Sequence, residues 1–466
     1  MTELPQKVID LSLAVRAAGG RALLVGGCVR DKLMGAQPKD WDLEVYALEA
    51  ARLRESLDQF GSVNVVGEAF TVYKLGNHVD ISIPRRERKS GRGHKGFVIE
   101  GDPGMEVAEA TRRRDFTINA ILQDPLTGEL IDPYEGQRDI QQRVLRAVSS
   151  ETFAEDSLRV LRAAQFAARF EFDIDPDTVA LCRSVDLGDL PAERIWGELE
   201  KLLLQAQRPS IGFEWLRKLG AIEQLFPEIQ DLIEVPQDPE WHPEGDVFVH
   251  TKLVVDRARE LIDELAYPRQ VTVMLAALAH DFGKPATTEF LEGRWRSRGH
   301  EEAGVPPAES FLTRINVHTL DGYNVRGQVI ALVRDHLKPG EFYKKRDEIG
   351  EGAFRRLARR CEPDLLYRVS KADSLGRNAD WVPREKWYGA EAQEWFIQRT
   401  RELEVERRAP DPILLGRHLL ELGLQPGPQV GEITRAVYEM QLDGRVRTLE
   451  EAIDEAKKIL AADERG

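Results

Sequence analysis

The stretch LLVGGCVRDKLMGAQPKDWDLEVY (residues 23–46) joins two apolar runs through a pair of glycines and an aspartate-rich turn. Gly26 and Gly27 stand where a strand would turn into a helix, and their bare backbone lets a phosphate approach the amide groups at the start of that helix. Asp40 and Asp42 are two positions apart, so in a strand both carboxylates point to the same face. Adjacent carboxylates repel each other unless a cation joins them. The stretch predicts a cation beside a phosphate, with a charged edge strand as the plainer alternative.

Strand and helix signals divide the chain into a mixed first part and a helical second part. Short β-rich runs bounded by glycine or proline predict strands at residues 21–27, 41–47, 62–67, 70–76 and 78–84. From residue 151 onwards, apolar residues recur every three or four positions, which predicts helices. We therefore predict an α+β fold, in which a head with a small mixed sheet precedes an all-helical neck and body. The expected domains are a head (1–150), a helical neck (151–226), a histidine-rich helical domain (227–400) and a helical tail (401–466).

Composition excludes several classes of protein. The 466 residues carry a formal net charge of −15, which argues against a broad basic surface for nucleic acid but leaves room for a local basic groove. Cys28, Cys182 and Cys361 are far apart, so neither a disulfide framework nor a thiolate zinc site is expected. No run approaches the roughly 18 apolar residues of a membrane span. We expect a cytoplasmic, multi-domain protein that does not enter a membrane.

A third carboxylate extends the pattern of the opening stretch. Asp80 lies in the strand expected at 78–84, where Ile81 occupies the other face. Oxygen ligands suit Mg²⁺. Asp40, Asp42 and Asp80 make up the catalytic set that two-metal nucleotidyl transfer requires, in which one Mg²⁺ activates an attacking hydroxyl group and the other holds a triphosphate and its leaving group.

Five motifs in the first half of the chain resemble those of one family, in content and in order. They are GGCVRDKLMGAQPKDWD (26–42), RRRDFTINAIL (112–122), LIDPYEGQRDIQQRVLRAV (130–148), EDSLRVLRAAQFAARFEF (155–172) and PAERIWGELEKLL (191–203). The series resembles the class II tRNA nucleotidyltransferases, or CCA-adding enzymes, and the related bacterial poly(A) polymerases. The resemblance implies template-independent addition of C and A from CTP and ATP to the 3′ end of tRNA. Addition of the terminal A alone, poly(A) synthesis, and a phosphohydrolase whose head only binds RNA are the alternatives.

The resemblance also implies roles for single residues. Asp40 and Asp42 would bind Mg²⁺ with Asp80 nearby, although the family more often has glutamate at the third position. A solvated basic patch is the plainer reading of the arginines at 112–114. The residues implied in binding the nucleotide are Gly26, Gly27, Arg30, Asp31, Arg114, Asp115, Asn119 and Arg162.

Asp156 and Arg159 are candidates for selecting the base of the incoming nucleotide. They stand three positions apart in a predicted helix and so share a face, where they offer an acceptor beside a fork of donors. Cytosine and adenine present an amino group beside a ring-nitrogen acceptor. Guanine and uracil reverse that order and would leave groups unpaired, at about 1–3 kcal/mol per buried group. The resemblance implies the same role, and an ordinary helical salt bridge is the alternative.

A basic segment follows Asp80. Residues 85–95 contain six Lys or Arg side chains and one glutamate, interleaved with glycines. We expect a mobile basic loop beside the catalytic carboxylates that contacts RNA. In the family, such a loop is associated with addition of the final A. The expected RNA contacts are Arg85, Arg86, Arg88, Lys89, Arg92 and Lys95.

Histidines gather in the third quarter of the chain, which holds six of the nine. His280 and Asp281 follow an apolar helical run, and with His250 and Asp373 they form an H…HD…D pattern whose nitrogen and oxygen donors suit Mn²⁺, Ni²⁺ or Zn²⁺. This part resembles the HD domain of bacterial CCA-adding enzymes, which implies a phosphohydrolase acting on RNA ends. A metal-free helical scaffold that binds RNA is the alternative. We expect two further histidines, His300 and His336, to contact the substrate or support the ligands.

Overall fold

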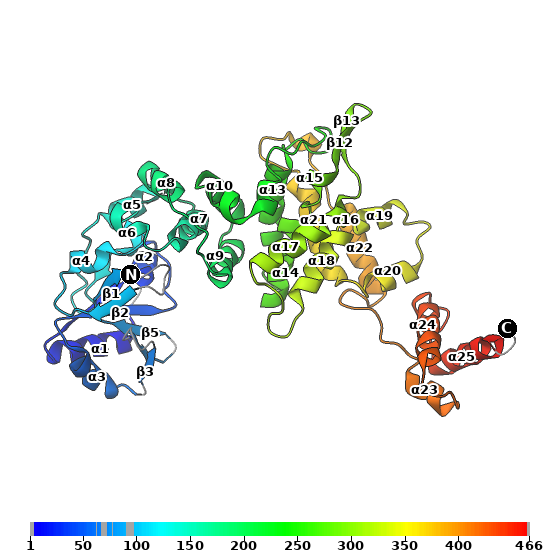
Figure 1. Cartoon of the computed structure of the whole chain (residues 1–466), viewed down its shortest axis with the longest axis horizontal. Helices are drawn as coiled ribbons and strands as arrows, with labels where there is room; N and C mark the ends of the chain where they lie inside the picture. Colours follow the sequence, from blue (N-terminus) through cyan, green and yellow to red (C-terminus); the bar gives the residue numbers. More distant parts are fainter. Residues whose placement is uncertain (1–3, 62, 67–71, 77, 90–96, 464–466) are drawn as a thin grey trace. The chain divides into compact units, whose positions relative to one another are not determined.

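The structure is a computed structural model that describes residues 4–61, 63–66, 72–76, 78–89 and 97–463 of the chain. Its contacts divide the chain into two compact units. The first comprises Met1–Leu202 and Ile211–Leu225, and the second comprises Leu203–Ser210 and Phe226–Gly466. Figure 1 labels the helices and strands of both units.

A seven-stranded mixed sheet forms the centre of the first unit, in the order β3-β4-β5-β2-β1-β8-β9. Figure 1 labels β1, β2, β3 and β5 among its strands. β2 and β5 run parallel, and the other neighbouring strands are antiparallel. The small mixed sheet expected for the head is confirmed. Its strands are β1 (Arg21–Val25), β2 (Trp41–Tyr46), β3 (Val63–Val66), β4 (Val72–Leu75), β5 (Val79–Ser82), β8 (Leu122–Gln123) and β9 (Leu130–Ile131).

The sheet has an apolar core on each face, because successive side chains of a strand point in opposite directions. Leu24 packs on one face with Val8 and Leu11 of α1 (Gln6–Ala17). Leu23 packs on the other face with Ala110. The apolar run at 22–25 is therefore buried on both sides, which holds the turn that follows it in place. The other helices around the sheet are α2 (Gly27–Leu33), α3 (Ala50–Asp58), α4 (Val107–Arg112), η1 (Thr117–Asn119) and α5 (Gly136–Gln142).

The basic segment after Asp80 begins as a strand. β6 (Arg85–Lys89) pairs with β7 (Phe97–Gly101) in an antiparallel hairpin, so the predicted loop is wrong for residues 85–89. The sequence RRERK has little strand propensity, but the β-forming sequence FVIEG opposite it supplies backbone partners. Arg92 and Lys95 lie outside the described residues, and only the backbone is described at Arg86, Arg88 and Lys89.

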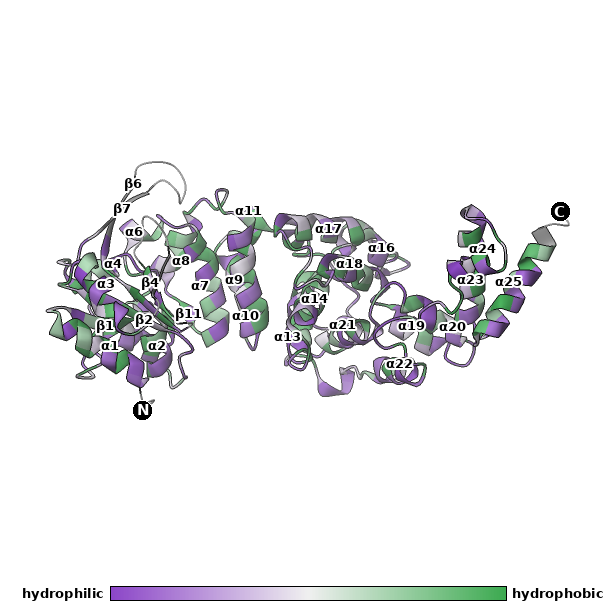
Figure 2. Ribbon diagram, turned by 90° about the horizontal axis from the view of Figure 1, so that it is seen from below, coloured by the Kyte–Doolittle hydropathy of each residue, from purple (hydrophilic) through white to green (hydrophobic). Residues whose placement is uncertain are grey.

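Helices form most of the rest of the first unit, and hydrophobic and hydrophilic residues mix along them, as in α7 and α9 (Figure 2). α7 (Leu158–Phe170) begins later than the predicted helix, so Asp156 lies in the turn before it. β10 (Val144–Leu145) and β11 (Asp173–Ile174) add a short parallel pair. The remaining helices are α6 (Ser150–Phe153), α8 (Pro176–Arg183), α9 (Ala192–Gln205), α10 (Pro209–Lys218) and α11 (Ala221–Leu225). The end of α9 from Leu203 and the start of α10 up to Ser210 belong to the second unit.

Helices α13 (Val247–Arg259), α14 (Tyr267–Ala279), α18 (Val325–Asp335) and α21 (Pro363–Gly376) form the centre of the second unit. α13 and α21 approach so closely that a Cβ atom on Gly376 would lie 2.5 Å from Cγ2 of Val254. β12 (Thr288–Leu291) and β13 (Arg294–Ser297) form a hairpin, so the expectation of a purely helical body is wrong at this point.

The remaining helices of the second unit surround this centre or follow it in the chain. The last three share a small apolar cluster that includes Leu419, Ile433 and Ala456. Among the helices that the structure describes, none is long and apolar enough to cross a membrane. These remaining helices are α12 (Pro227–Gln230), α15 (Lys284–Thr287), α16 (His300–Ala303), α17 (Val305–Arg314), α19 (Lys338–Lys344), α20 (Glu351–Leu357), η2 (Arg384–Lys386), α22 (Glu391–Glu402), α23 (Gly416–Glu421), α24 (Pro428–Leu442) and α25 (Leu449–Asp463).

Candidate functional site

Three carboxylates meet where the parallel strands β2 and β5 begin. The register places Asp42 directly opposite Asp80, and Nζ of Lys74 lies 3.0 Å from Oδ2 of Asp80. Asp40 precedes β2 rather than lying in it, and its Oδ1 is 3.0 Å from Nδ1 of His78. The structure thus brings the three predicted carboxylates to one edge of the sheet. Lys74 and His78 were not predicted there.

Arg114 lies next to the glycine turn and the carboxylates. Gly26 has φ 73°, and a Cβ atom there would lie 2.9 Å from Nη1 of Arg114. The positive φ favours glycine at this position, whereas the guanidinium, at the end of a flexible side chain, could shift to make room for a Cβ atom. Partial desolvation by the surrounding protein raises the pKa of Asp42, although the residue is exposed to solvent; Arg114 opposes this shift, and the charges of Asp80 and Asp40 add to it. Arg114 supplies positive charge at the position where the sequence pattern expects a phosphate.

A chain of hydrogen bonds runs from α2 through η1 to α7. Arg30 donates from Nε to Oδ1 of Asp31 (2.8 Å) and from Nη1 to Oδ1 of Asn119 (2.6 Å). Asn119 donates to Oδ1 of Asp115 (2.9 Å), and Arg162 donates from Nε to Oδ2 of the same carboxylate (2.8 Å). The structure therefore links five predicted nucleotide-binding residues into one network.

The centre of this network is buried. Arg30 is only 4% exposed, and its guanidinium lies over the rings of Phe166 and Phe170, 5.2 and 4.6 Å from their centres. Burial alone would raise the pKa of Asp115, but Arg162 and hydrogen bonds from Asn119 and the Phe116 amide lower the pKa below its ordinary value. Asp115 is therefore held as a carboxylate.

The proposed base-selecting residues each have another partner. Oδ2 of Asp156 accepts from Arg194 at 2.9 Å, and Oδ1 accepts from the Leu158 amide at 3.2 Å. Arg159 donates to the backbone carbonyl groups of Thr152, at 2.8 Å, and of Arg113. The simple Asp156–Arg159 salt bridge is therefore not formed. Arg194 lies in the motif PAERIWGELEKLL (191–203), but its contact with Asp156 was not predicted from the sequence.

The histidine-rich cluster lies in the second unit, between α13, α14 and α21. Nε2 of His250 is 3.1 Å from Oδ1 of Asp373 and 3.8 Å from Oδ2 of Asp281, which lies 3.2 Å from Nε2 of His280. The structure brings the four predicted ligands together. His250 and His280 are at most 1% exposed. Their mixed nitrogen and oxygen donors form a set that could hold a transition metal.

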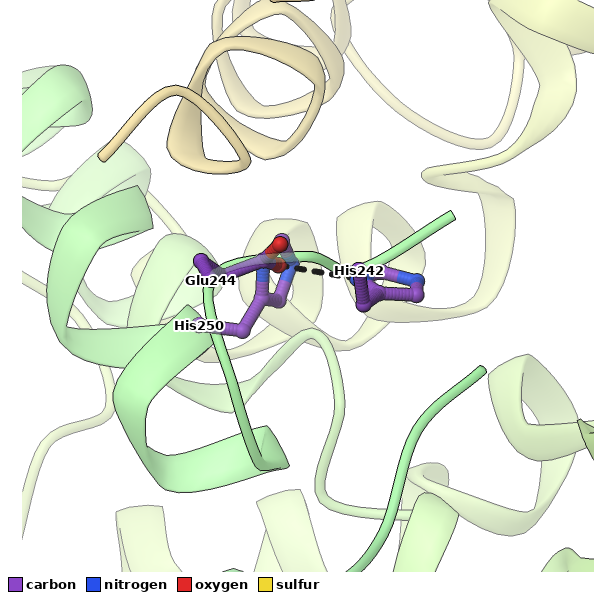
Figure 3. Close-up of side chains that lie close together, drawn as sticks. All are labelled: His242, Glu244 and His250. Atoms are coloured by element: carbon purple, nitrogen blue, oxygen red, sulfur yellow. Dashed lines mark hydrogen bonds and ion pairs between the residues drawn. The ribbon is translucent and has the colours of Figure 1, made fainter. Parts of the chain in front are cut away.

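Glu244 was not predicted as part of the cluster, although its side chain lies against two histidines (Figure 3). Its Oε1 accepts from Nδ1 of His242 at 2.9 Å and from Nδ1 of His250 at 2.7 Å. Burial lowers the pKa of His242 to about 4. Burial alone would raise the pKa of Glu244, but the hydrogen bonds from both histidines lower it to about 2. Glu244 therefore fixes which nitrogen of His250 faces Asp373.

Two more histidines join the cluster from α16 and the end of α18. Nε2 of His300 lies 3.4 Å from Oδ1 of Asp281 and 3.2 Å from Nε2 of His336. Burial, together with His300 and His280, lowers the pKa of His336 to about 3. With Asp281 they form a second group of donors that could hold a metal ion.

A cavity of about 230 Å³ opens beside these groups. His300, His336, Asp281 and Asp373 line its polar part, together with the cationic side chains of Lys284 and Arg377. Trp241 and Trp295 also line it, and they are 50% and 37% exposed. The cavity therefore combines two cationic side chains, which can bind an anionic group, with two flat aromatic side chains.

A curated relative places the chain in a family. The "Multifunctional CCA protein" of Xanthomonas campestris pv. campestris (strain B100) is 37% identical over 426 residues, which cover 88% of this chain and 95% of the relative. The chain belongs to the family of the multifunctional CCA proteins. Three family models match it in order: "Poly A polymerase head domain" at residues 22–146, "Probable RNA and SrmB- binding site of polymerase A" at 171–233, and "HD domain" at 247–378.

Solved structures confirm the fold expected for this multifunctional CCA protein family. The Bacillus stearothermophilus CCA-adding enzyme in complex with CTP superposes with a TM-score of 0.65 at 18% identity, covering 99% of both chains. The Thermotoga maritima CCA-adding enzyme complexed with tRNA_CCA superposes with a TM-score of 0.59 at 20% identity, covering 98% of this chain and 97% of the other. The resemblance seen in the motifs is confirmed by sequence and by fold.

Proposed function

We propose that this chain adds C and A nucleotides to the 3′ end of tRNA, with CTP and ATP as substrates. The 3′-hydroxyl oxygen of the tRNA attacks the α-phosphorus of the nucleotide, the bond to the β-phosphate breaks, and pyrophosphate leaves. The observation that carries this proposal is the meeting of Asp42 and Asp80 across β2 and β5, beside Asp40 and Arg114. Family membership supports the same reaction. tRNA and nucleoside triphosphates are cytoplasmic, so we place the reaction in the cytoplasm.

Asp40 and Asp42 fit Mg²⁺, because both offer carboxylate oxygens that solvent can reach. Two Mg²⁺ ions would supply activation of the attacking hydroxyl group and neutralisation of the leaving pyrophosphate. Arg114 lies where it can bind the triphosphate beside the Gly26 turn. The buried network that ends at Arg30 keeps α2, and so this turn, in position.

Asp156 and Arg159 are proposed to select the base. A base that pairs with them competes with Arg194 and with the backbone contacts of Arg159. Cytosine and adenine can replace both sets of contacts, because each offers an amino donor for Asp156 and a ring-nitrogen acceptor for Arg159. Guanine and uracil cannot replace them in this way. The basic residues of 85–95 are proposed to contact the RNA. We keep the division into head (1–150), neck (151–226), HD domain (227–400) and tail (401–466) as a proposal.

The histidine-rich cluster supports a second activity, metal-dependent hydrolysis of phosphate esters at RNA ends. His250, His280, Asp281 and Asp373 would hold Mn²⁺, Ni²⁺ or Zn²⁺. Lys284 and Arg377 line the adjoining cavity and would bind the phosphate, and Trp241 and Trp295 would stack on the terminal base. These features go beyond what an RNA-binding scaffold requires.

A single assay separates the proposed transferase from its alternatives. The protein is incubated with Mg²⁺, single nucleotides and tRNA transcripts that end before CCA, after the first C and after the second C. We expect CTP incorporation on the two shorter transcripts and ATP incorporation on the longest. ATP incorporation alone would identify an A-adding enzyme, and long A tails on unrelated RNA would identify a poly(A) polymerase.

The hydrolase is tested by metal analysis and by release of phosphate from RNA ends. We expect the purified protein to retain a transition metal and to hydrolyse a terminal phosphate ester, and His280→Ala to lose both properties. An equal metal content in the two proteins would contradict the metal site. His318→Ala, an exposed histidine of the same unit, is the matched control.

A further inference from the structure

Exposed tryptophans gather in three segments of the second unit. Among the residues that the structure describes, the tryptophans with exposed side chains are Trp241, Trp295, Trp381 and Trp387, and their exposed fractions run from 37% to 62%. Trp241 and Trp295 line the cavity beside the histidine-rich cluster. Large aromatic side chains are unfavourable in water, so their concentration in one region indicates an interaction surface.

The hairpin of β12 and β13 carries two aromatic rings on the face that meets the cavity. Trp295 and Ser297 both line the cavity, and they lie two positions apart on one strand. Phe290 is directly opposite Trp295, so its side chain lies on the same face. The two ring centres are 5.1 Å apart, and Phe290 is 59% exposed. Because Oγ1 of Thr288 donates to the backbone carbonyl of Lys284 at 2.7 Å, the hairpin is anchored at its base and extends the cavity wall outwards.

The segment after α21 brings Trp381 to the loop that carries Trp241. Nε1 of Trp381 donates to the backbone carbonyl oxygen of Glu244 at 3.1 Å, and the hydroxyl group of Tyr388 donates to that of Glu240 at 3.3 Å. The first bond satisfies the single polar atom of the indole ring, while the side chain remains 62% exposed. Trp381 is therefore held close to Trp241 with much of its apolar surface open to a ligand.

The volume and charge of the cavity suit the end of a larger anionic molecule. Its volume of about 230 Å³ lies below the about 300–1,000 Å³ of pockets that enclose drug-sized ligands. A phosphate ester fits inside, and the rest of such a ligand extends over the aromatic side chains outside. Lys284 and Arg377 line the cavity and favour an anion there, and exposed Arg298 follows β13. An apolar protein segment would not require these cations.

The inclination of two rings favours unpaired nucleotides. The planes of Phe290 and Trp295 meet at 63°. Neighbouring bases of a duplex lie parallel to each other, so they cannot stack on both rings at once. The bases of a single strand can turn independently and stack on separate aromatic side chains. The hairpin therefore fits a single strand better than a base-paired end.

We propose that Trp241, Phe290, Trp295 and Trp381 form an aromatic rim that binds the last unpaired nucleotides of a single-stranded RNA. This proposal rests on the proposed hydrolase, because the cavity holds the terminal phosphate ester of the same RNA. The terminal base stacks on Trp241 or Trp295, and the nucleotides before it lie against Phe290 and Trp381. The rim therefore selects an unpaired RNA end over a free nucleotide and over a base-paired end.

Hydrolysis of three substrates with the same terminal phosphate ester tests the rim. They are a nucleoside monophosphate, a single-stranded RNA of about six nucleotides, and an RNA hairpin whose end is base-paired. We expect the full-length chain to have the highest kcat/KM with the single strand. Phe290→Ala and Trp381→Ala should each lower the ratio of kcat/KM for the single strand to that for the monophosphate by about ten-fold, mainly through KM, because each removes one base-stacking surface.

Two further variants separate stacking from the stability of the hairpin. Phe290→Tyr keeps a flat ring and should keep the ratio. Leu291→Ala removes a 39% exposed side chain from the opposite face of the same hairpin, and it should also keep the ratio. An equal loss of activity towards the monophosphate and the single strand in Phe290→Ala and Trp381→Ala would overturn the rim, because it would indicate damage to the cavity.

The rim and the proposed hydrolase fail in distinguishable ways. An unchanged ratio in both alanine variants, or equal hydrolysis of paired and unpaired ends, would overturn the rim and leave the hydrolase standing. If no substrate is hydrolysed, the hydrolase is refuted, and light-induced crosslinking of a thiouridine-containing single strand to the full chain then decides. Crosslinks to peptides that contain Trp241 or Phe290 would support the rim. Their absence would overturn it and assign the aromatic surface to a protein partner.

Discussion

Asp42 of β2 lies directly opposite Asp80 of β5 in a parallel pairing. Parallel neighbours need a crossover connection between them, and here α3, β3 and β4 supply it. The pairing brings a carboxylate from a separate segment to the edge where Asp40 already lies. Repulsion among these groups makes the edge receptive to cations.

We expect Asp42→Asn to reduce nucleotide addition by at least about 10³-fold, equal to about 4 kcal/mol of transition-state stabilisation. The amide keeps the shape of the side chain but removes the charge that would hold Mg²⁺. Single-turnover addition of CTP to a transcript that ends before CCA measures the effect. Asp58→Asn changes an exposed carboxylate of α3 that pairs with Arg54, and it should leave the rate unchanged. Normal addition by Asp42→Asn would refute the metal assignment.

Asp156→Ala and Arg159→Ala should weaken the choice of base more than the rate of addition. We expect discrimination of CTP and ATP against UTP and GTP to fall about ten-fold or more. In the wild type a wrong base leaves Asp156 or Arg159 without a hydrogen-bond partner, and the variant lacks the side chain that incurs this cost. Competition between nucleotides in one reaction measures the ratio. Arg138→Ala removes an exposed arginine of α5 and should preserve it. If both variants slow all four nucleotides equally, Asp156 and Arg159 have a structural role only.

Asp115→Asn should destabilise the first unit by about 2–3 kcal/mol at neutral pH, because it leaves Arg162 without its closest anion. The pKa of Asp115 is lowered in the folded protein, so its contribution is complete above the unfolded pKa of about 3.9 and is lost progressively as the pH falls below that value towards the lower pKa of the folded state. The difference between the wild type and Asp115→Asn should therefore shrink when the pH is lowered from 6 to 3.5.

Urea unfolding of the full chain, followed by a signal from the first unit, measures this difference at each pH. Asp58→Asn should differ little from the wild type at either pH, because an exposed pair contributes about 0–1 kcal/mol. A difference for Asp115→Asn that stays constant or grows on acidification would show that the carboxylate is not the stabilising form.

Glu244→Gln should weaken metal binding in the HD domain by about 10- to 100-fold without removing a ligand. Glu244 orients His250 through Nδ1, and the neutral amide accepts that hydrogen bond more weakly than a carboxylate does. Competition with a chelator measures the affinity. Glu240→Gln alters an exposed carboxylate paired with Arg294 and serves as the control. Unchanged affinity in Glu244→Gln would mean that packing alone orients His250.

Much of the fold followed from local patterns. The β-rich run at 21–25 and the apolar run before His280 form β1 and α14 because strand propensity and helical periodicity depend on neighbours in the sequence. The hairpin of β6 and β7 could not be predicted from local patterns, because the RRERK segment forms a strand only by pairing with β7. The exact start of α7 was also missed, and with it the position of Asp156.

Residue types and their order were sufficient to identify the nucleotidyltransferase family and to select Asp40, Asp42, His250 and Asp373 as candidates. Their neighbours could not be found in this way. Glu244 contacts His250 because the irregular segment before α13 folds back on it, and His300 reaches His336 because α16 packs on α18. Side-chain chemistry is encoded residue by residue, whereas contacts between distant segments arise only when apolar faces are buried together. Packing therefore decided which of these groups lie close enough to one another to share a cation.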